Sequence, residues 1–447
     1  MSTPLVVGGL VCAVIVLIVC TVKIKLHPFF ALIATTVTFA VISGMDLNMM
    51  LEAFASGMGG TVADIGLVIA LGTVTGALLE KSGGAEKMAK SILKVTGEKH
   101  AALGLAITGY FVSIPVFCDS AYVLLRPIAK RLSKDTKISM TTMAVATCMG
   151  LHATHMFVPP TPGPLAVAGI LNADLGNAIL FGALVSIPVT IVAYFAAKFE
   201  GKKYYYLPHV EEEEDGGTGR PLPNTFMAFA PILVPIALML LKTILSMTGL
   251  TGIAVDVMNV LGTPPVALLA GLIIAAIGYH QICPEDKTAW GFDGVLAEAL
   301  RTAGQIVLIV GAGGAFSGVL KASPLQDIIT NSFSGLSIGI LAPFVIGAIF
   351  RTCVGSATIA MVTSATMIYP LLDVLGFGSP MGHIIAMLAC AAGGMMVFHG
   401  NDDFFWVVTT TSDMDTSVAY KTIPIISVLQ SLTALLCVFL LSLVFLH

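Results

Sequence analysis

Apolar runs long enough to cross a membrane as helices alternate with short polar loops along nearly the whole chain. A span needs about 20 apolar residues, and residues 5–22 and 26–43 form the first two such runs. The pattern then predicts an outer loop at 44–59 without Lys or Arg, a span at 61–79, and a short surface helix in the basic segment 81–99. We therefore expect an all-α protein that crosses the membrane many times.

Residues 101–129 are apolar over a greater length than one span needs, and they contain a single acid, Asp119. Lys and Arg residues flank this stretch on both sides, at 81–99 and at 130–137. Because loops rich in Lys and Arg stay in the cytoplasm, both ends of the stretch belong on the same side of the membrane. We predict a re-entrant hairpin that enters to about mid-membrane, breaks at 115–120 and returns. Irregular backbone at that depth must be buried in protein or line a wet cavity.

The second half of the chain repeats this plan. Residues 338–370 form another long apolar stretch, interrupted at 351–356 and flanked by loops almost free of Lys and Arg, so they predict a hairpin that enters from outside. Two more helices are over-long and interrupted, at 158–164 by a run of prolines and at 399–403 by polar residues. Since proline disrupts a helix interior, and charged residues avoid the bilayer core, we predict that both helices are broken at membrane depth.

The polar stretch 198–224 separates a first membrane repeat, residues 1–197, from a second, residues 225–447. We interpret the stretch as a cytoplasmic linker, and the charge distribution places the N- and C-termini outside. The plan comprises about ten transmembrane helices together with the re-entrant hairpins and the broken helices. The second repeat would start in the inverted orientation, and inverted repeats with helices broken at the midplane are typical of secondary transporters.

Composition agrees with a membrane protein and argues against other classes. Of the 447 residues, 56% are hydrophobic and 11% charged, whereas soluble domains carry roughly 25% charged residues. No basic patch suggests a nucleic-acid partner. The eight cysteines show no CxxC spacing, so we expect packing residues and no disulfide framework. The first apolar run lacks a basic leader and a small-residue cleavage site, which favours a retained helix over a signal peptide.

Asp119 and the serines near it, Ser113 and Ser120, are the first candidates for a binding site. The Asp119 carboxylate could cap a hairpin helix, or it could bind a proton or contact the substrate. An acid at membrane depth is costly and is functional by default, so we favour the second interpretation.

The second hairpin carries a candidate anion site. Ser356 and Thr358 stand where a half-helix should begin, and helix N-termini attract anions through free N–H groups and the helix dipole. A packing face of small residues is the alternative. Arg351 could pair with a substrate carboxylate, or with Asp402 or Asp403 as a buried structural pair, and the sequence leaves both possibilities open.

His152 and His155 lie one helical turn apart, but no convincing third metal ligand accompanies them. We expect no metal or cofactor, and we assign the histidines either to hydrogen-bonded packing or to the handling of protons or substrate. The segment 399–403 in the second broken helix could bind substrate hydroxyls or cations.

Inverted symmetry should bring both hairpin tips and both helix breaks together near the midplane. The substrate-binding candidates are Ser113, Asp119, Ser120, Thr161, Arg351, Ser356, Thr358, Asn401 and Asp402. The proton-coupling candidates are Asp119, His152, His155, Asp402 and Asp403.

At these residues the sequence resembles the gluconate permease family of proton-coupled organic-acid transporters, over essentially the whole chain. The motifs that carry the resemblance are Phe117-x-Asp119-x-x-x-Val123-Leu124-Leu125-x-Pro127, Val158-Pro159-Pro160-x-Pro162, Gly311-Ala312-Gly313-Gly314-Ala315-Phe316, Val354-Gly355-Ser356-Ala357-Thr358 and Asn401-Asp402-x-x-Phe405-Trp406. Each motif is weak by itself, and together they are specific.

The resemblance implies an elevator-type homodimer with scaffold and transport domains, which takes gluconate, similar aldonates, D-serine or other small hydroxy acids. Family members often carry Glu, His and Ser where this chain has Asp119, Thr161 and Asp403, so a shorter acid such as glycerate or 3-hydroxybutyrate is a further expectation. We expect a symporter, not an enzyme, that imports a small organic-acid anion with protons or sodium ions across the bacterial inner membrane. An anion channel and an intramembrane enzyme are the alternatives, although Ser356 lacks the G-x-S-x-G frame of a hydrolase.

Overall fold

Helices make up most of the computed structural model, which describes residues 1–24, 26–208, 221–248, 251–325, 328, 339–400 and 402–446. The α-helices are α1 (Thr3–Ile18), α2 (Pro28–Ser43), α3 (Leu47–Lys81), α4 (Gly84–Thr96), α5 (Ala101–Val112), α6 (Cys118–Thr136), α7 (Met140–Phe157), α8 (Pro162–Ile170), α9 (Leu175–Lys203), α10 (Thr225–Thr248), α11 (Ile253–Leu261), α12 (Pro264–Ile282), α13 (Val295–Lys321), α15 (Leu341–Val354), α16 (Ala357–Ile368), α17 (Pro380–Gly394), α18 (Asp403–Thr411) and α19 (Thr416–Phe445). No strand occurs within the described residues. The prediction of an all-α fold is confirmed.

Several of these helices have the length and hydropathy of membrane spans. Within the described part of the chain, five qualify by themselves: α9, α10, α12, α13 and α19. Helix α3 makes a sixth if its two segments, which meet at a bend of 42°, count as one span. Shorter apolar helices include α1, α2, α15, α16 and α17, and the last three lie next to the breaks of the second half.

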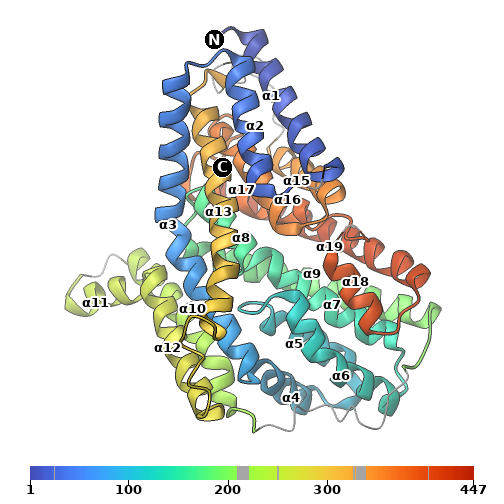
Figure 1. Cartoon of the computed structure of the whole chain (residues 1–447). Coiled ribbons are helices and arrows are strands. Elements are labelled where there is room, and N and C mark those ends of the chain that lie inside the picture. The colour runs from blue at the N-terminus through green and yellow to red at the C-terminus, as the bar shows by residue number, and fades with distance from the viewer. Residues whose placement is uncertain are drawn as a thin grey trace.

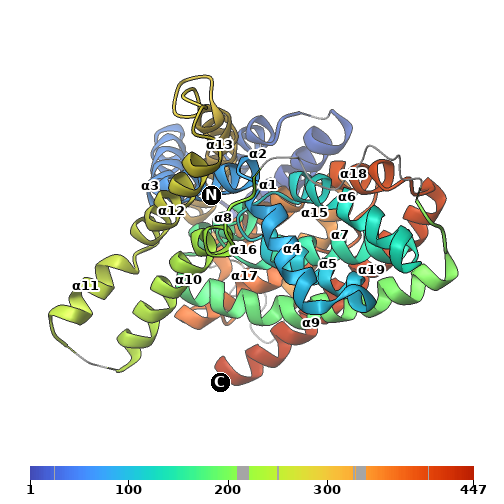
Figure 2. The ribbon, with the colours of Figure 1, turned by 90° about the horizontal axis from the view of Figure 1, so that it is seen from below.

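Helix α3 lies alongside α13 over much of its length, with the N-terminus of the chain near one end of the pair and α4 near the other (Figure 1). Seen from below, α11 and α12 lie on one flank of the molecule, and α18 and α19 lie on the opposite flank (Figure 2). The hairpin and broken helices α5, α6, α7 and α18 gather on that second flank. Of the short helices next to the breaks, α8 and α16 contact the long α3–α13 pair.

The predicted outer loop at 44–59 is wrong, because α3 already begins at Leu47. Asp46 starts the helix by accepting hydrogen bonds from the backbone N–H groups of Asn48 and Met49, at 2.9 and 3.1 Å. Such a cap satisfies N–H groups that have no partner within the helix. The pattern missed this part of α3 because the acid and glycines in it interrupt the apolar run.

Glycines let α3 and α13 approach closely. A Cβ atom added to Gly57 of α3 would lie 2.3 Å from the carbonyl oxygen of Gly314, and one added to Gly314 would lie 2.6 Å from the carbonyl oxygen of Gly57. The Cβ atom added to Gly57 would also lie 3.2 Å from the Cα atom of Gly318. Small residues at such spacing allow two membrane helices to pack backbone against backbone.

We expect Gly57→Ala to destabilise the protein, because its methyl group has no room against backbone atoms of α13. Overpacking of this kind costs about 1–3 kcal/mol. The matched control is Gly59→Ala in the same helix, where an added Cβ meets nothing within 4 Å and the better helix propensity of alanine should stabilise. Thermal unfolding of both variants in detergent tests this. Equal melting temperatures for the two would contradict the close packing.

Each of the two stretches expected to form a re-entrant hairpin contains a pair of helices separated by a break. Helices α5 and α6 replace the stretch predicted at 101–129, with the break at 113–117 and a second arm that continues to Thr136. Helices α15 and α16 replace the stretch predicted at 338–370. Their break begins at Gly355, whose φ of +84° lies in the left-handed region that favours glycine. Arg351, expected inside that break, lies in the last turn of α15.

The two broken helices are also present, with shifted boundaries. Residues 158–161 separate α7 from α8, and α8 begins at Pro162. Proline is tolerated there because the first turn of a helix has no internal acceptor for its N–H groups. Residues 395–402 separate α17 from α18, which is a longer break than the expected one at 399–403.

The stretch interpreted as a linker, 198–224, begins as helix, since α9 continues to Lys203. Residues 209–220 of the stretch lie outside the described residues.

Candidate functional site

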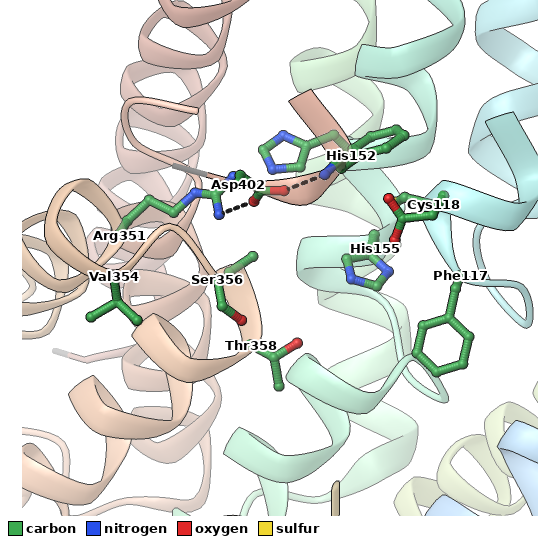
Figure 3. A pocket seen from close by; sticks show the side chains of 12 residues that line it. Phe117, Cys118, His152, His155, Arg351, Val354, Ser356, Thr358 and Asp402 are labelled. Carbon is green, nitrogen blue, oxygen red and sulfur yellow. Dashed lines mark hydrogen bonds and ion pairs between the residues drawn. The ribbon is translucent and has the colours of Figure 1, made fainter. Parts of the chain in front are cut away.

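A cavity of about 290 Å³ lies where the hairpin tips approach the broken helices (Figure 3). Its lining residues are Phe117, Cys118 and Asp119 at the start of α6, His152 and His155 in α7, Arg351 and Val354 in α15, Ser356, Ala357 and Thr358 at the start of α16, and Asp402 and Phe404 at the start of α18. The structure thus brings together residues from both hairpins and both broken helices.

Arg351 is the largest charged group of the cavity wall and is almost completely buried, at 1% exposure. Its Nη1 atom donates hydrogen bonds to the carboxylate of Asp402 and to the carbonyl oxygen of Gly355. The guanidinium carbon also lies 5.1 Å from the centre of the Phe398 ring. Of the pairings that the sequence left open for Arg351, this conformation therefore contains the one with Asp402.

Asp402 has a second task as the N-cap of α18. Its Oδ1 atom accepts a hydrogen bond of 2.8 Å from the backbone N–H of Phe404, and Oδ2 pairs with Arg351. A carboxylate at a helix N-terminus also interacts favourably with the helix dipole. The Asp402 side chain is 14% exposed. Because its carboxylate both caps α18 and pairs with Arg351 of α15, it links these two helices at the cavity.

The N-terminus of α16 faces the cavity, as the sequence predicted for a half-helix. Ser356 is its N-cap and accepts a hydrogen bond of 3.5 Å from the backbone N–H of Ile359, while Thr358 lies in the first turn. Both side chains point towards the centre of the cavity (Figure 3). The N-terminus of α6 meets the same cavity, and its cap residue, Phe117, provides no side-chain hydrogen bond. The N-termini of two half-helices therefore approach one cavity, and their dipoles favour an anion.

The two histidines lie in the last turns of α7. The His152 ring stacks on Phe398 with 5.1 Å between ring centres, and its Nδ1 atom is 3.4 Å from Oε1 of Gln430. Within the described part of the chain, Nε2 of His152 and Nδ1 of His155 are buried without a hydrogen-bond partner. Buried polar atoms usually have a hydrogen-bond partner. A bound molecule or a water in the cavity could provide that partner for these two nitrogens.

Asp119 lies in the first turn of α6, lines the cavity and is exposed. Ser113 and Ser120 do not line it. The Ser113 hydroxyl is buried 3.4 Å from Sγ of Cys118, and Ser120 lines a separate cavity of about 150 Å³ with Glu80. The sequence argument grouped the three residues by proximity along the chain, and the fold separates them.

Three more candidates lie in or beside the helix breaks. The Thr161 hydroxyl donates a hydrogen bond of 2.6 Å to the carbonyl oxygen of Val158. Thr161 does not line the main cavity; it lines a small neighbouring cavity, which it shares with His155. Asp403 is the first residue of α18. Asn401 lies outside the described residues.

Sequence reasoning did not propose Cys118 or Phe404, which line the cavity. It used three other lining residues, Phe117, Val354 and Ala357, only as parts of motifs. Each of them is adjacent or nearly adjacent to a proposed polar residue. The breaks themselves were the available signal, because residues flanking a break at membrane depth have to line whatever cavity the break creates.

A comparison with solved structures finds one with a similar fold. The crystal structure of the YdaH transporter of Alcanivorax borkumensis, described as having an unusual topology, matches with a TM-score of 0.61 at 18% identity, over 89% of each chain. The family model for GntP family permeases matches residues 5–444. The chain belongs to this family, which confirms the resemblance drawn from its motifs.

Individual relatives carry related names. An uncharacterized permease of Haemophilus influenzae is 36% identical over 391 residues, which cover 83% of this chain and 78% of that protein. The gluconate permease of Pseudomonas aeruginosa is 31% identical over 450 residues and 96% of each chain. The D-serine transporter DsdX of Escherichia coli K12 is 32% identical over 382 residues, or 84% and 85% of the two chains. The protein is therefore a membrane permease of a bacterial family.

Proposed function

We propose that this permease is a secondary active transporter that imports gluconate or a related small hydroxy carboxylate with protons. The observation that carries the proposal is the buried guanidinium of Arg351 in a cavity that the N-terminus of α16 also faces. A carboxylate would find there a guanidinium, which is paired with Asp402 in this structure, and a helix dipole. The names of the gluconate and D-serine transporters among the relatives support the same substrate class.

The size of the cavity favours a small acid. Pockets for drug-sized ligands measure roughly 300–1,000 Å³, and this one measures about 290 Å³. Other polar groups of the cavity wall, from Asp119 and His155, suit the hydroxyl groups of a sugar acid. Glycerate, 3-hydroxybutyrate and D-serine would use the same carboxylate contacts with fewer hydroxyl contacts, so they are the alternative substrates.

We also propose alternating access by an elevator-type homodimer built from inverted repeats, residues 1–197 and 225–447. The order of elements supports the repeats. A hairpin (α5 and α6) precedes a broken helix (α7 and α8) in the first half, and α15 and α16 precede α17 and α18 in the second. Such elements meet at the substrate site of secondary transporters with inverted repeats.

The proposed orientation in the inner membrane puts both termini outside and α4 in the cytoplasm. Lys94→Cys in α4 and Lys134→Cys in the second hairpin arm, both at exposed positions, should then react with a membrane-impermeant thiol reagent only from the cytoplasmic side. Ser2→Cys, also exposed, is the matched control and should react only from outside. Labelling of Lys94→Cys from outside in intact cells would refute the proposed orientation.

Transport assays in proteoliposomes test the function itself. Radiolabelled gluconate should accumulate against its gradient when the outside is acidic, and unlabelled gluconate inside should accelerate entry of label, as a carrier requires and a channel does not. Competition by glycerate, 3-hydroxybutyrate and D-serine ranks the substrates, and replacing the proton gradient by a sodium gradient identifies the coupling ion. Absence of uptake for every acid under both gradients would refute the proposal.

A further inference from the structure

The ion pair between Arg351 and Asp402 occupies the place where a substrate carboxylate would bind. Both residues line the cavity, and Figure 3 shows the guanidinium directed at the Asp402 carboxylate. Arg351 uses one nitrogen, Nη1, for both Asp402 and Gly355, while its buried Nε has no hydrogen-bond partner among the described residues. The cation of the site is thus held by an internal carboxylate.

Separating Arg351 from Asp402 is unfavourable unless another group compensates the charge of each. Arg351 is 1% and Asp402 14% exposed, and removing one member of a buried ion pair leaves an uncompensated charge, which is strongly unfavourable. A substrate carboxylate could compensate Arg351, and a proton could compensate Asp402. Neither event is favourable alone, because the first crowds two carboxylates around one guanidinium and the second leaves the guanidinium without an anion.

We propose that the Arg351–Asp402 pair is the coupling device of this permease: protonation of Asp402 releases Arg351, which then binds the substrate carboxylate. The inference rests on the proposed function and specifies the proton site within it. The charges balance. In the empty site the ion pair consists of the Arg351 cation and the Asp402 carboxylate. In the loaded site the same cation pairs with the substrate carboxylate, Asp402 is neutral, and the charge of Asp119, the other acid in the lining, is unchanged. One proton therefore accompanies each monocarboxylate, and transport moves no net charge.

The titratable and charged groups near Asp402 come from three helices that border the cavity and from the break that contains Asp402. They are Arg351 from α15, His152 and His155 from α7, Cys118 and Asp119 from α6, and His399 from the same break as Asp402. Of the carboxylates whose side chains the structure describes in this wall, Asp402 is the one in an ion pair with the guanidinium. His399 instead lies with Nε2 3.4 Å from the carbonyl oxygen of Thr352.

Binding of gluconate to the purified wild-type protein gives the first test. If one proton must bind with the acid, gluconate should bind more weakly as the pH rises, by about tenfold per pH unit in the range where binding takes up one full proton. Calorimetry in buffers of different ionisation enthalpy should then show one proton taken up per gluconate. Binding of gluconate without proton uptake would overturn the exchange and leave the transport function intact.

Asp402→Asn gives the second test, since asparagine keeps the N-cap of α18 but cannot be protonated. Gluconate binding should become independent of pH. In proteoliposomes, exchange of labelled for unlabelled gluconate should persist without pH dependence, and accumulation driven by a pH gradient should be lost. Asp402→Glu should restore the pH dependence. The matched control is Asp413→Asn, because Asp413 also forms an ion pair, 2.8 Å from Lys130, but lines no part of the cavity.

These outcomes separate the inference from the proposed function. Failure of the wild-type protein to transport any acid refutes the function. Transport by the wild type combined with pH-driven accumulation by Asp402→Asn, or with loss of binding by a folded Asp402→Asn, refutes the exchange alone.

Discussion

Arg351→Gln is expected to lower gluconate uptake by at least about a hundredfold, since a lost hydrogen bond to a charged group costs about 1.5–3 kcal/mol and the substitution removes more than one. The variant loses the cation that would bind the substrate carboxylate, and it leaves Asp402 as an unpaired carboxylate in the same cavity. Arg351→Lys should recover only part of the activity, because an ammonium group cannot bind a carboxylate in the bidentate geometry of a guanidinium.

Initial rates of uptake in proteoliposomes, measured over a range of gluconate concentrations, would show whether affinity or turnover is lost. Lys130→Gln is the matched control. Lys130 is likewise a buried cation in an ion pair, at 7% side-chain exposure and 2.8 Å from Asp413, but it does not line the cavity. Its variant should keep an apparent affinity close to that of the wild type. If Arg351→Gln transported gluconate with normal affinity, the carboxylate would have to bind elsewhere.

The sequence predicted where the backbone breaks, because breaks have strong chemical causes. Prolines at 159–164, the acid within an apolar stretch at 101–129 and Gly355 all conflict with a continuous helix in a membrane. The hairpins and broken helices found in the structure lie at these places. Their boundaries shifted by a few residues, since a first-turn proline or a capping aspartate such as Asp402 lets a helix begin inside the apparent break.

The direction of each side chain was harder to predict. Successive residues of an α-helix point about 100° apart, so neighbours in sequence can face different surroundings. Asp119 lines the main cavity, whereas Ser120 lines the one that contains Glu80. Apolar lining residues such as Phe404 carry no signal, because their types are common throughout the core. The positions of the breaks therefore predicted where the cavity lies, whereas the residues that line it depend on the three-dimensional packing.

Packing between distant segments also decided a part of the fold that the apolar runs did not show. Helix α3 extends to Leu47 because glycines such as Gly57 pack against the backbone of α13. That contact joins residues far apart in the chain, and the window of sequence around Gly57 is rich in glycine and small residues, with an acid at each end, Glu52 and Asp64, so it resembles a loop. Helix propensity is a weak local signal that tertiary contacts override.

Asp119→Ala is expected to weaken gluconate binding by about ten- to a hundredfold, the effect of one lost hydrogen bond to a charged group, and to leave proton coupling in place. The sequence argument gave Asp119 both a binding and a proton role, on the premise that an acid at membrane depth is desolvated. In the structure its side chain is exposed and lines the cavity, where its carboxylate can accept hydrogen bonds from substrate hydroxyls, whereas Asp402 forms the ion pair with Arg351.

The substitution should therefore change selectivity more than coupling. The preference for gluconate over an unhydroxylated carboxylic acid of the same length should fall together with gluconate affinity, while the stimulation of uptake by an acidic outside should persist. Asp135→Ala, at an exposed position later in the same helix and beside Arg131, is the matched control and should affect neither property. Loss of pH-driven accumulation in Asp119→Ala, with gluconate affinity unchanged, would move the proton from Asp402 to Asp119 and reverse the roles that the cavity geometry suggests for the two acids.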